Sequence, residues 1–197
     1  VRPCFQEVER IRLRPHATAD RQRDRQRIAD PLHHSAFRNA TRTAARLYDL
    51  QAANPDVMTI ASPTSGKRVA RHWQIPKSRE DLVLRRQAML RWARASCGFF
   101  GRSPDHIPSA LAGMVAGIDR LRQYDARGAQ ALIDYFAFAR DNDLFVTYTI
   151  VNPQANQAKT AGQQTAEGFP ACRVVDQDAQ GIIVDGAKML GTSAIMA

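Results

Sequence analysis

The chain has 197 residues, of which 44% are apolar and 24% charged, the balance of a globular protein that can bury a core. It is long enough for one ordinary domain or for one and a half small ones. No apolar run reaches the about 18 residues of a membrane-spanning helix, and the N-terminus does not resemble a secretory signal. Three widely spaced cysteines (Cys4, Cys97 and Cys172) argue against a disulfide framework and predict a reducing, cytoplasmic location.

The net charge of +9 is concentrated near the start of the chain, in the segment 21–27. This Arg-rich run has no interleaved aromatic residues and no zinc-ligand spacing, so a solvated arm is favoured over a nucleic-acid site. A basic active-site mouth that attracts anionic phenolates is a third interpretation. Because Pro3, Pro15 and scattered charges give no sustained period, we expect residues 1–28 to be a disordered or non-native basic arm.

Helical patterns dominate residues 35–143. Loop signals at Asn54-Pro55 and Ser62–Gly66 separate the first helix from the next. Ser78 with Asp81 three residues later predicts a capping box, and Gly98 predicts the end of that helix. The predicted buried faces are Phe37, Thr41, Ala44, Ala45 and Tyr48; Leu82, Met89, Trp92 and Ala93; Leu111, Met114, Val115, Ile118 and Leu121, after a first turn at Pro108; and Leu132, Tyr135, Phe136 and Ala139.

The period changes at Leu144, where Leu144–Val151 is rich in β-branched and aromatic residues and predicts a strand. A polar stretch follows Pro153, and Arg173–Val175 with Gly181–Val184 predict a hairpin. Helices before strands indicate an α+β fold or two domains. Because Ala197 falls where further strands are needed to complete a sheet, we expect a truncated chain.

Several motifs lack the residues that their chemistry needs. Ser65-Gly66-Lys67 is followed by Arg68, and Ala61 stands where a phosphate loop has its first Gly. The adjacent pair His33-His34 cannot converge on one ion from a helix and has no accompanying carboxylate or thiol cluster. Neither G-x-S-x-G nor G-x-G-x-x-G occurs. We therefore expect no metal site, no hydrolytic nucleophile and no Rossmann dinucleotide site.

The segment Gly101–His106 places two ionisable side chains on a turn between two helices. Arg102 is permanently charged and can pair with a phenolate or carboxylate, and His106 can exchange a proton near neutral pH. Asp105 offers a structural alternative because it can cap the helix near Pro108. The residues alone leave a structural turn and a functional turn equally open.

Residues from about Asp30 to Ala197 resemble the oxygenase component of the 4-hydroxyphenylacetate 3-monooxygenase family, which includes chlorophenol monooxygenases and pyoverdine-chromophore-type hydroxylases. Several blocks in the same order carry this resemblance. They are Phe37–Ala40 with Ala45–Asp49, Ser62–Gly66, Cys97–His106, Val151–Gln154 and Gly181–Lys188.

The resemblance implies an α+β, acyl-CoA-dehydrogenase-like fold. Residues 29–143 would form the helical N-terminal domain and residues 144–197 the start of the middle, flavin-binding β domain. The C-terminal four-helix bundle would be missing. The full-length parent would be a homotetramer or homodimer without nucleic-acid or membrane partners.

The family hydroxylates phenols with O₂ and FADH₂ that a separate flavin reductase supplies, through a C4a-hydroperoxyflavin. By resemblance, Arg102, His106 and Tyr148 are the catalytic residues, and these three with Ser103 bind the substrate. The 4-hydroxyphenylacetate enzymes have Tyr at position 106 and His at position 148, so the identity of the phenol stays open. The implied cofactor-binding residues are Tyr148, Gln154, Ala155, Asn156, Gln157 and Thr192.

Two alternatives remain. The truncated chain would be an inactive fragment if the bundle closes the active site. A 4-hydroxybutyryl-CoA-dehydratase-like FAD enzyme would need several cysteines around an iron–sulfur cluster, and Cys97 has Gly101, not Cys, four residues on.

Overall fold

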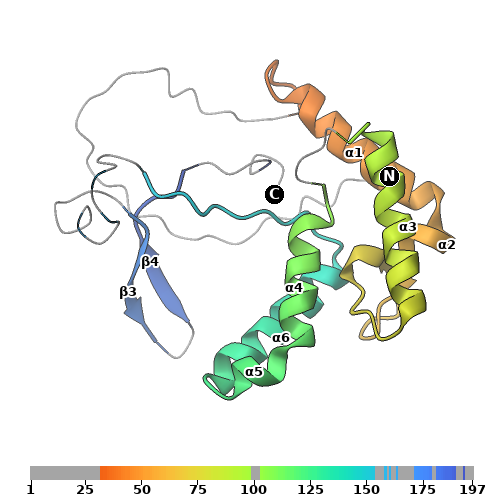
Figure 1. Cartoon of the computed structure of the whole chain (residues 1–197). Coiled ribbons are helices and arrows are strands. Elements are labelled where there is room, and N and C mark those ends of the chain that lie inside the picture. Colours follow the sequence, from red (N-terminus) through yellow and green to blue (C-terminus); the bar gives the residue numbers. More distant parts are fainter. Residues whose placement is uncertain are drawn as a thin grey trace. The chain divides into compact units, whose positions relative to one another are not determined.

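A computed structural model describes residues 32–98, 103–153, 158, 160, 163, 171–178, 181–189 and 193 (Figure 1). They belong to two compact units, one that includes residues 32–150 and one that includes residues 151–189. The predicted basic arm at 1–28 lies outside the described residues. So do Arg102, residues 154–157 and Thr192 of the predicted site.

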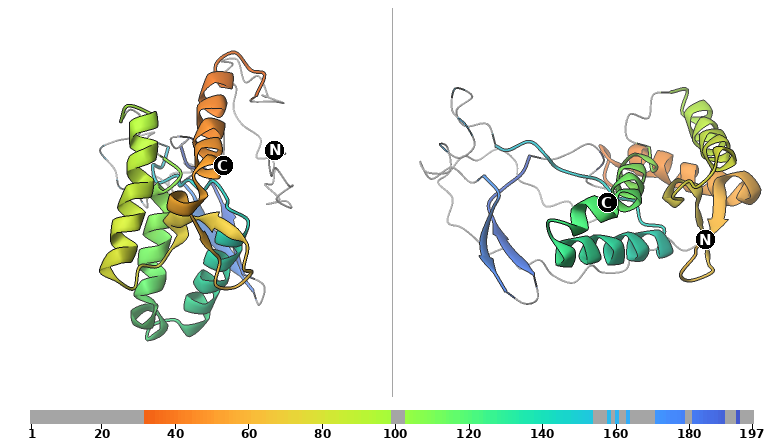
Figure 2. Two further views of the ribbon diagram at one scale, coloured as in Figure 1. Left: turned by 90° about the vertical axis from the view of Figure 1, so that its right-hand side faces the viewer. Right: turned by 60° about the horizontal axis from the view of Figure 1, so that its bottom comes forward.

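The first unit is mainly helical. Its elements in chain order are α1 (Arg38–Ala53), α2 (Pro55–Met58), β1 (Thr59–Ala61), β2 (Arg68–Ala70), the short 3₁₀ helix η1 (Arg71–Trp73), α3 (Arg79–Ala95), α4 (His106–Ala116), α5 (Ile118–Arg122) and α6 (Ala126–Asp141). The strands β1 and β2 pair antiparallel, with Ile60 opposite Val69. In both views of Figure 2, α4 lies beside α6, which it contacts. No helix of the described residues is long and apolar enough to cross a membrane.

Two apolar clusters hold this unit together. One is built from η1, α4 and α6 around Trp73 and Phe136, whose rings meet edge to face at 5.6 Å. The other joins α1, α2 and α3 around Trp92, whose indole N–H donates to the Leu47 carbonyl at 2.9 Å. Tertiary packing of this kind, more than helix propensity, stabilises helices of these lengths.

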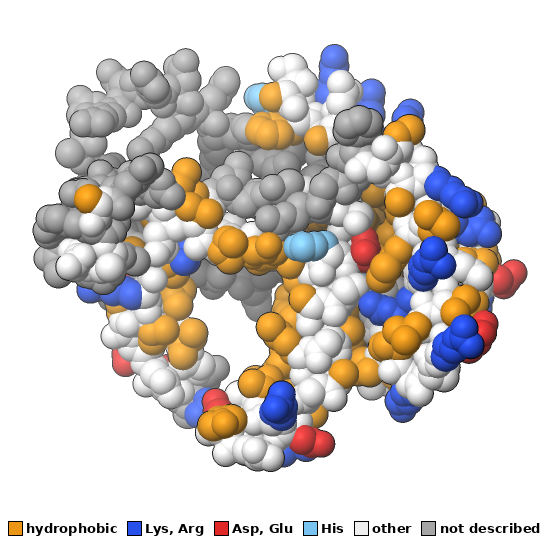
Figure 3. All heavy atoms as spheres, in the orientation of Figure 1, with side chains coloured by type: hydrophobic (Ala, Val, Ile, Leu, Met, Phe, Trp, Pro, Cys, Tyr) orange, Lys and Arg blue, Asp and Glu red, His pale blue; other side chains and the backbone are white. Residues whose placement is uncertain are grey.

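The predicted helix α3 begins as expected but buries only part of the predicted face, at Trp92. Ser78 and Asp81 form the predicted capping box. The side chains that α3 buries are Arg85, Ala88 and Trp92, whereas Leu82 is 56% exposed and Ala93 is also exposed. The prediction of Leu82 and Ala93 as core residues is therefore wrong. Figure 3 shows apolar and basic side chains intermingled over α3 on the exposed side.

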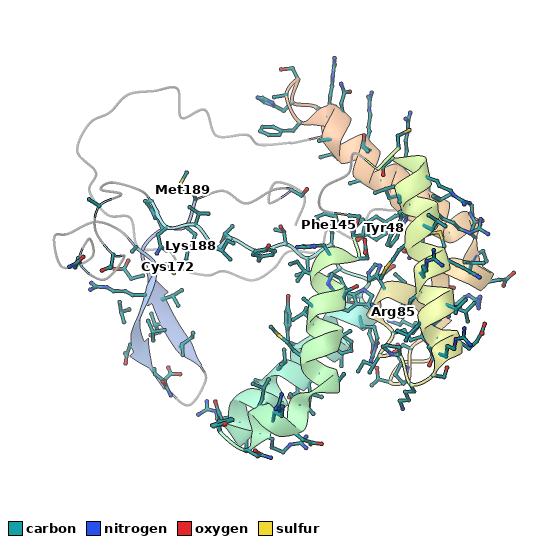
Figure 4. The ribbon with its side chains drawn as sticks, in the orientation of Figure 1. Tyr48, Arg85, Phe145, Cys172, Lys188 and Met189 are labelled. Atoms are coloured by element: carbon teal, nitrogen blue, oxygen red, sulfur yellow. The ribbon has the colours of Figure 1, made fainter. Side chains whose placement is uncertain are left out.

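Arg85 explains the change of face, because its guanidinium has partners inside the unit. Nη1 donates to the carbonyl oxygens of His72 at 2.7 Å and Gln74 at 2.5 Å, and Nη2 donates to Ser109 Oγ at 3.0 Å. The side chain lies between α3 and α4 (Figure 4). Burial lowers the pKa of Arg85, and the negative charge of Asp105 opposes this shift.

The pattern that predicts one helix from Pro108 to Leu121 is divided at Gly117. Gly117 ends α4 and precedes the one-turn helix α5. Its N–H donates to the Gly113 and Met114 carbonyls, both at 3.2 Å. Met114 and Leu121, which the periodicity assigns to the core, are 54% and 44% exposed. Because the helix is interrupted at Gly117, the apolar residues of the predicted helix do not all share one buried face.

The predicted strand Leu144–Val151 is not a strand in the described structure; it is a connector that follows α6. Leu144 and Val146 pack against the cluster around Trp73 and Phe136. Alternating apolar residues need a partner strand to form a ladder, and here Leu144 and Val146 are partly buried against helices instead, whereas Ile150 and Val151 are exposed.

The second unit contains the predicted hairpin, which is confirmed. Strands β3 (Arg173–Gln177) and β4 (Ile182–Asp185) pair antiparallel, with a register shift between Val174 and Asp176. Gly186 follows with φ at 116°, where a Cβ would collide with the Ala171 carbonyl. Lys188 Nζ donates to Asn152 Oδ1 at 2.6 Å, joining residues near the two ends of the segment 151–189.

The buried contacts of Arg85 give a direct prediction. Arg85→Met keeps the length of the side chain but leaves the carbonyls of His72 and Gln74 and the Ser109 hydroxyl without their donor. We expect a loss of about 3 kcal/mol in the free energy of unfolding, measured by urea denaturation. The exposed neighbour Arg86 provides the control, and Arg86→Met should stay within about 0.5 kcal/mol of the parent chain. Equal losses in both variants would contradict this role of Arg85.

His72 is the second buried polar side chain with consequences for stability. Its ring lies 5.2 Å from that of Trp92 and 5.6 Å from that of Trp73. Burial, reinforced by the positive charge of Arg85, lowers the pKa of His72 to about 3. The folded chain therefore holds a neutral imidazole while the unfolded chain takes up a proton below about pH 6.5.

We predict that the contribution of His72 to stability is fully present above pH 6.5 and is lost as the pH falls toward 3. The total loss is on the order of 4 kcal/mol. His72→Phe removes the titration, so its urea midpoint should depend less on pH between 6.5 and 4 than that of the parent chain. His33→Ala, at an exposed histidine, should leave the slope unchanged; a slope that His72→Phe does not alter would refute the prediction.

Candidate functional site

The first turn of α4 forms one side of the candidate site. Ser103 Oγ donates to the Asp105 carboxylate, and the His106 N–H donates to the Ser103 carbonyl at 3.0 Å. Asp105 occupies the N-cap position, but its side chain makes no capping hydrogen bond. The alternative in which Asp105 serves as a side-chain cap is therefore wrong, because its carboxylate binds Ser103 instead.

Arg85 fixes where this turn lies. Its hydrogen bond to Ser109 Oγ joins α3 to the first turn of α4, and the Ser109 N–H donates to the Asp105 carbonyl at 2.9 Å. Pro108 is fully buried in the same turn. His106 is the first helical residue and its side chain remains exposed, so a rigid turn presents an accessible imidazole.

Tyr148 forms the other side of the candidate site. The rings of His106 and Tyr148 are stacked, with centroids 5.7 Å apart and planes inclined by 21°. These two residues come from separate elements, α4 and the connector after α6. The structure thus brings together two of the predicted site residues, with Ser103 in the same turn. The remaining predicted residues (Arg102, Gln154, Ala155, Asn156, Gln157 and Thr192) lie outside the described part of the chain.

The stacked pair has useful chemistry for a polar aromatic ligand. The imidazole of His106 offers one donor and one acceptor when neutral, and the phenol of Tyr148 can donate or accept. Both rings are also flat apolar surfaces against which an aromatic ring can pack. Among the described residues no group of three or more His, Cys, Asp or Glu side chains is arranged to hold a metal ion.

A buried polar cluster lies at the C-terminal end of α6, where the connector begins. No pattern in the sequence predicts it. Gln51 Nε2 donates to Asp143 Oδ2 at 2.7 Å, and the Ala70 N–H donates to Asp143 Oδ1 at 3.2 Å. Burial raises the pKa of Asp143, although both hydrogen bonds oppose the shift. Burial, followed by the charge of Asp143, raises the pKa of Tyr48 on α1, whose hydroxyl oxygen is inaccessible to solvent (Figure 4).

The loop Ser62–Gly66 is held by the end of α6. Ser62 Oγ donates to Asp141 Oδ1 at 2.5 Å, the Thr64 hydroxyl donates to the same carboxylate, and Arg140 Nη2 donates to Thr64 Oγ1 at 2.7 Å. Burial acts to raise the pKa of Asp141, but the hydrogen bonds from these three side chains and the charge of Arg140 lower it to about 2. The segment Ser62–Gly66, one of those that carry the family resemblance, therefore has a structural role in closing the β1–β2 hairpin.

Comparison with known proteins places the chain in a family. The model of the N-terminal part of 4-hydroxyphenylacetate 3-hydroxylase matches residues 22–197. The chain belongs to this family, which confirms the resemblance seen in the sequence.

Relatives of known name agree with this assignment. The chain is 35% identical over 167 residues to the 4-hydroxyphenylacetate 3-monooxygenase oxygenase component of Geobacillus sp., covering 85% of this chain and 34% of the relative. It is 36% identical over 170 residues to the pyoverdin chromophore biosynthetic protein PvcC of Pseudomonas aeruginosa, covering 86% and 32%. The chain thus spans about a third of the length of these relatives.

Solved structures confirm the fold class. The crystal structure of a 4-hydroxyphenylacetate 3-monooxygenase oxygenase component, in complex with FAD and 4-hydroxyphenylacetate, matches with a TM-score of 0.71 and 36% identity over 82% of this chain and 33% of that one. A 4-hydroxybutyryl-CoA dehydratase from N. maritimus matches with a TM-score of 0.65 at 21% identity, which shows a shared fold alone. The acyl-CoA-dehydrogenase-like α+β prediction is confirmed.

The contact between His106 and Tyr148 can be measured by a double-mutant cycle. His106→Ala and Tyr148→Leu should be coupled by about 0.5–1 kcal/mol in the free energy of unfolding, because each variant removes the same ring contact. Tyr124, which is 90% exposed, supplies the control: Tyr124→Leu combined with His106→Ala should be additive. Additivity of the His106 and Tyr148 variants would mean that the rings do not interact in solution.

Proposed function

We propose that the chain is part of the oxygenase component of a two-component monooxygenase that hydroxylates a phenol with FADH₂ and O₂. The stacked pair of His106 and Tyr148 carries the proposal, because two aromatic, hydrogen-bonding side chains meet beside the turn that contains Ser103. Membership of the 4-hydroxyphenylacetate 3-hydroxylase family gives the reaction class.

The proposed roles follow from the chemistry of each side chain. Arg102 binds the phenolic oxygen and favours its anionic form, since guanidinium is charged at all relevant pH values. His106, at the start of α4, and Ser103, just before that helix, hydrogen-bond the substrate, and His106 can exchange its proton. Tyr148 packs against the substrate ring and offers its hydroxyl to either substrate or cofactor.

Tyr148 also supports the proposed flavin site. It is half-buried, and its ring, stacked on that of His106, is proposed to contact the flavin as well as the substrate. Gln154, Ala155, Asn156, Gln157 and Thr192 complete the proposed site by hydrogen-bonding the cofactor. When bound, reduced FAD supplies the electrons with which one oxygen atom is transferred to the phenol ring.

The wider organisation is part of the same proposal. Residues 29–143 form the helical domain and residues 144–197 contribute to the flavin-binding β domain. The protein is cytoplasmic, a separate flavin reductase delivers FADH₂, and the parent enzyme assembles as a homodimer or homotetramer. The alternative is that this chain does not catalyse on its own.

Arg102→Ala tests the substrate site. We expect it to weaken binding of 4-hydroxyphenylacetate to the purified chain by about 100-fold, because a charged hydrogen bond contributes about 1.5–3 kcal/mol. FAD binding should remain within about twofold, as judged by fluorescence titration under reducing conditions. Arg122→Ala removes an exposed arginine paired with Asp119 and should change neither affinity.

Loss of both affinities in Arg102→Ala would assign a structural role to that side chain and overturn the substrate assignment. Product analysis separates the two functional alternatives. Hydroxylated phenol formed from chemically reduced FAD and O₂ establishes catalysis by the chain itself, whereas binding without product supports the alternative of an incomplete enzyme.

A further inference from the structure

Tyr148 lies on the connector that follows α6. Its stacking on His106 therefore depends on contacts that hold the start of the connector in place and orient its side chains. Its first apolar residues, Leu144 and Val146, pack on the cluster around Trp73 and Phe136. Tyr148 is the next residue in this alternation, and its ring stacks on His106. The backbone conformation at the start of the connector therefore decides where Tyr148 lies.

The start of the connector is Asp143, and its backbone is unusual. Asp143 has φ at 47°, a left-handed conformation that ends α6 and turns the chain out of the helix. The Leu144 N–H still donates to the Ala139 carbonyl at 3.0 Å, so the turn is closed on the helix. Few residue types other than Gly, Asn and Asp adopt this conformation readily.

The Asp143 side chain is held from two other elements. One carboxylate oxygen accepts from Gln51 of α1 at 2.7 Å and the other from the Ala70 N–H at the end of β2 at 3.2 Å. Gln51 is buried, at 7% exposure, and Ala70 is fully buried. The Gln51–Asp143 bond joins residues 92 positions apart, so it ties the exit of α6 to a helix that contributes none of the candidate site residues.

We propose that Gln51 and Asp143 are positioning residues of the candidate phenol site: their hydrogen bond fixes the connector so that Tyr148 stacks on His106. The proposal rests on the proposed function only for its effect on phenol binding. Its structural part, the placement of Tyr148, can be tested independently of the proposed function.

The test uses two readouts on the purified chain. The first is the NMR signal of the His106 imidazole C–H groups, which the ring current of a stacked Tyr148 shifts; Tyr148→Leu defines the unstacked position. The second is the affinity for 4-hydroxyphenylacetate by isothermal titration calorimetry. Gln51→Met keeps the side-chain volume but removes the donor to Asp143. It should move the His106 signals toward the unstacked position and weaken phenol binding about tenfold.

Two variants at Asp143 distinguish the loss of these hydrogen bonds from a general destabilisation of the fold. Asp143→Asn tolerates the left-handed conformation and can accept from Ala70 while donating to the Gln51 carbonyl oxygen, so it should restore most of the parent behaviour. Asp143→Ala loses both interactions and should behave like Gln51→Met or worse. The matched control is Ser62→Ala, which removes a hydrogen bond to Asp141 at the same end of α6 and should leave the His106 signals in place.

Parent-like His106 signals in Gln51→Met and Asp143→Ala would overturn the positioning role. An equal shift in Ser62→Ala would also overturn it, because general loosening of α6 would then be sufficient. If the His106 signals move as expected while the parent chain itself binds no phenol, the positioning role is supported and the proposed function fails.

Discussion

The constraint on which most of the described helical unit depends is the buried guanidinium of Arg85. A buried charge is tolerated only when its N–H groups are hydrogen-bonded. The carbonyls of His72, in the 3₁₀ turn, and of the following Gln74 also need donors, and Arg85 Nη1 donates to both. Arg85 satisfies both requirements at once and extends to Ser109, so three elements are joined through one side chain.

That arrangement explains how a stable scaffold can present an exposed imidazole. The turn that carries His106 is held by the hydrogen bond from Arg85 to Ser109 and by the buried Pro108. It does not depend on a side-chain cap from Asp105. On the opposite side of the pair, Tyr148 lies on a connector that forms no strand in the described structure. One partner is therefore anchored by a helix, whereas the other depends on apolar packing and on the hydrogen bonds at Asp143.

Local signals in the sequence predicted local structure well. The capping box at Ser78 and the hairpin 173–185 require only residues close in sequence, and both are present. The buried face of α3 was predicted correctly at Trp92 but not at Arg85. Arg85 counts as polar in any periodicity, and only the carbonyls brought near it by the fold make its burial favourable. The segment after Leu144 has strand-like composition, but strand formation depends on a partner that composition does not supply.

The candidate site likewise contains features that the sequence indicates and features that depend on the fold. Periodicity and spacing left the turn at Gly101–His106 undecided, and the pairing of His106 with Tyr148 followed only from family resemblance. Gln51 carries no motif and lies 92 residues from its partner Asp143, so no local pattern could identify it. The reacting side chains of a family can be transferred by alignment of motifs. The hydrogen bonds that aim those side chains are set by the packing of this particular chain, and they become visible only when distant elements are placed together.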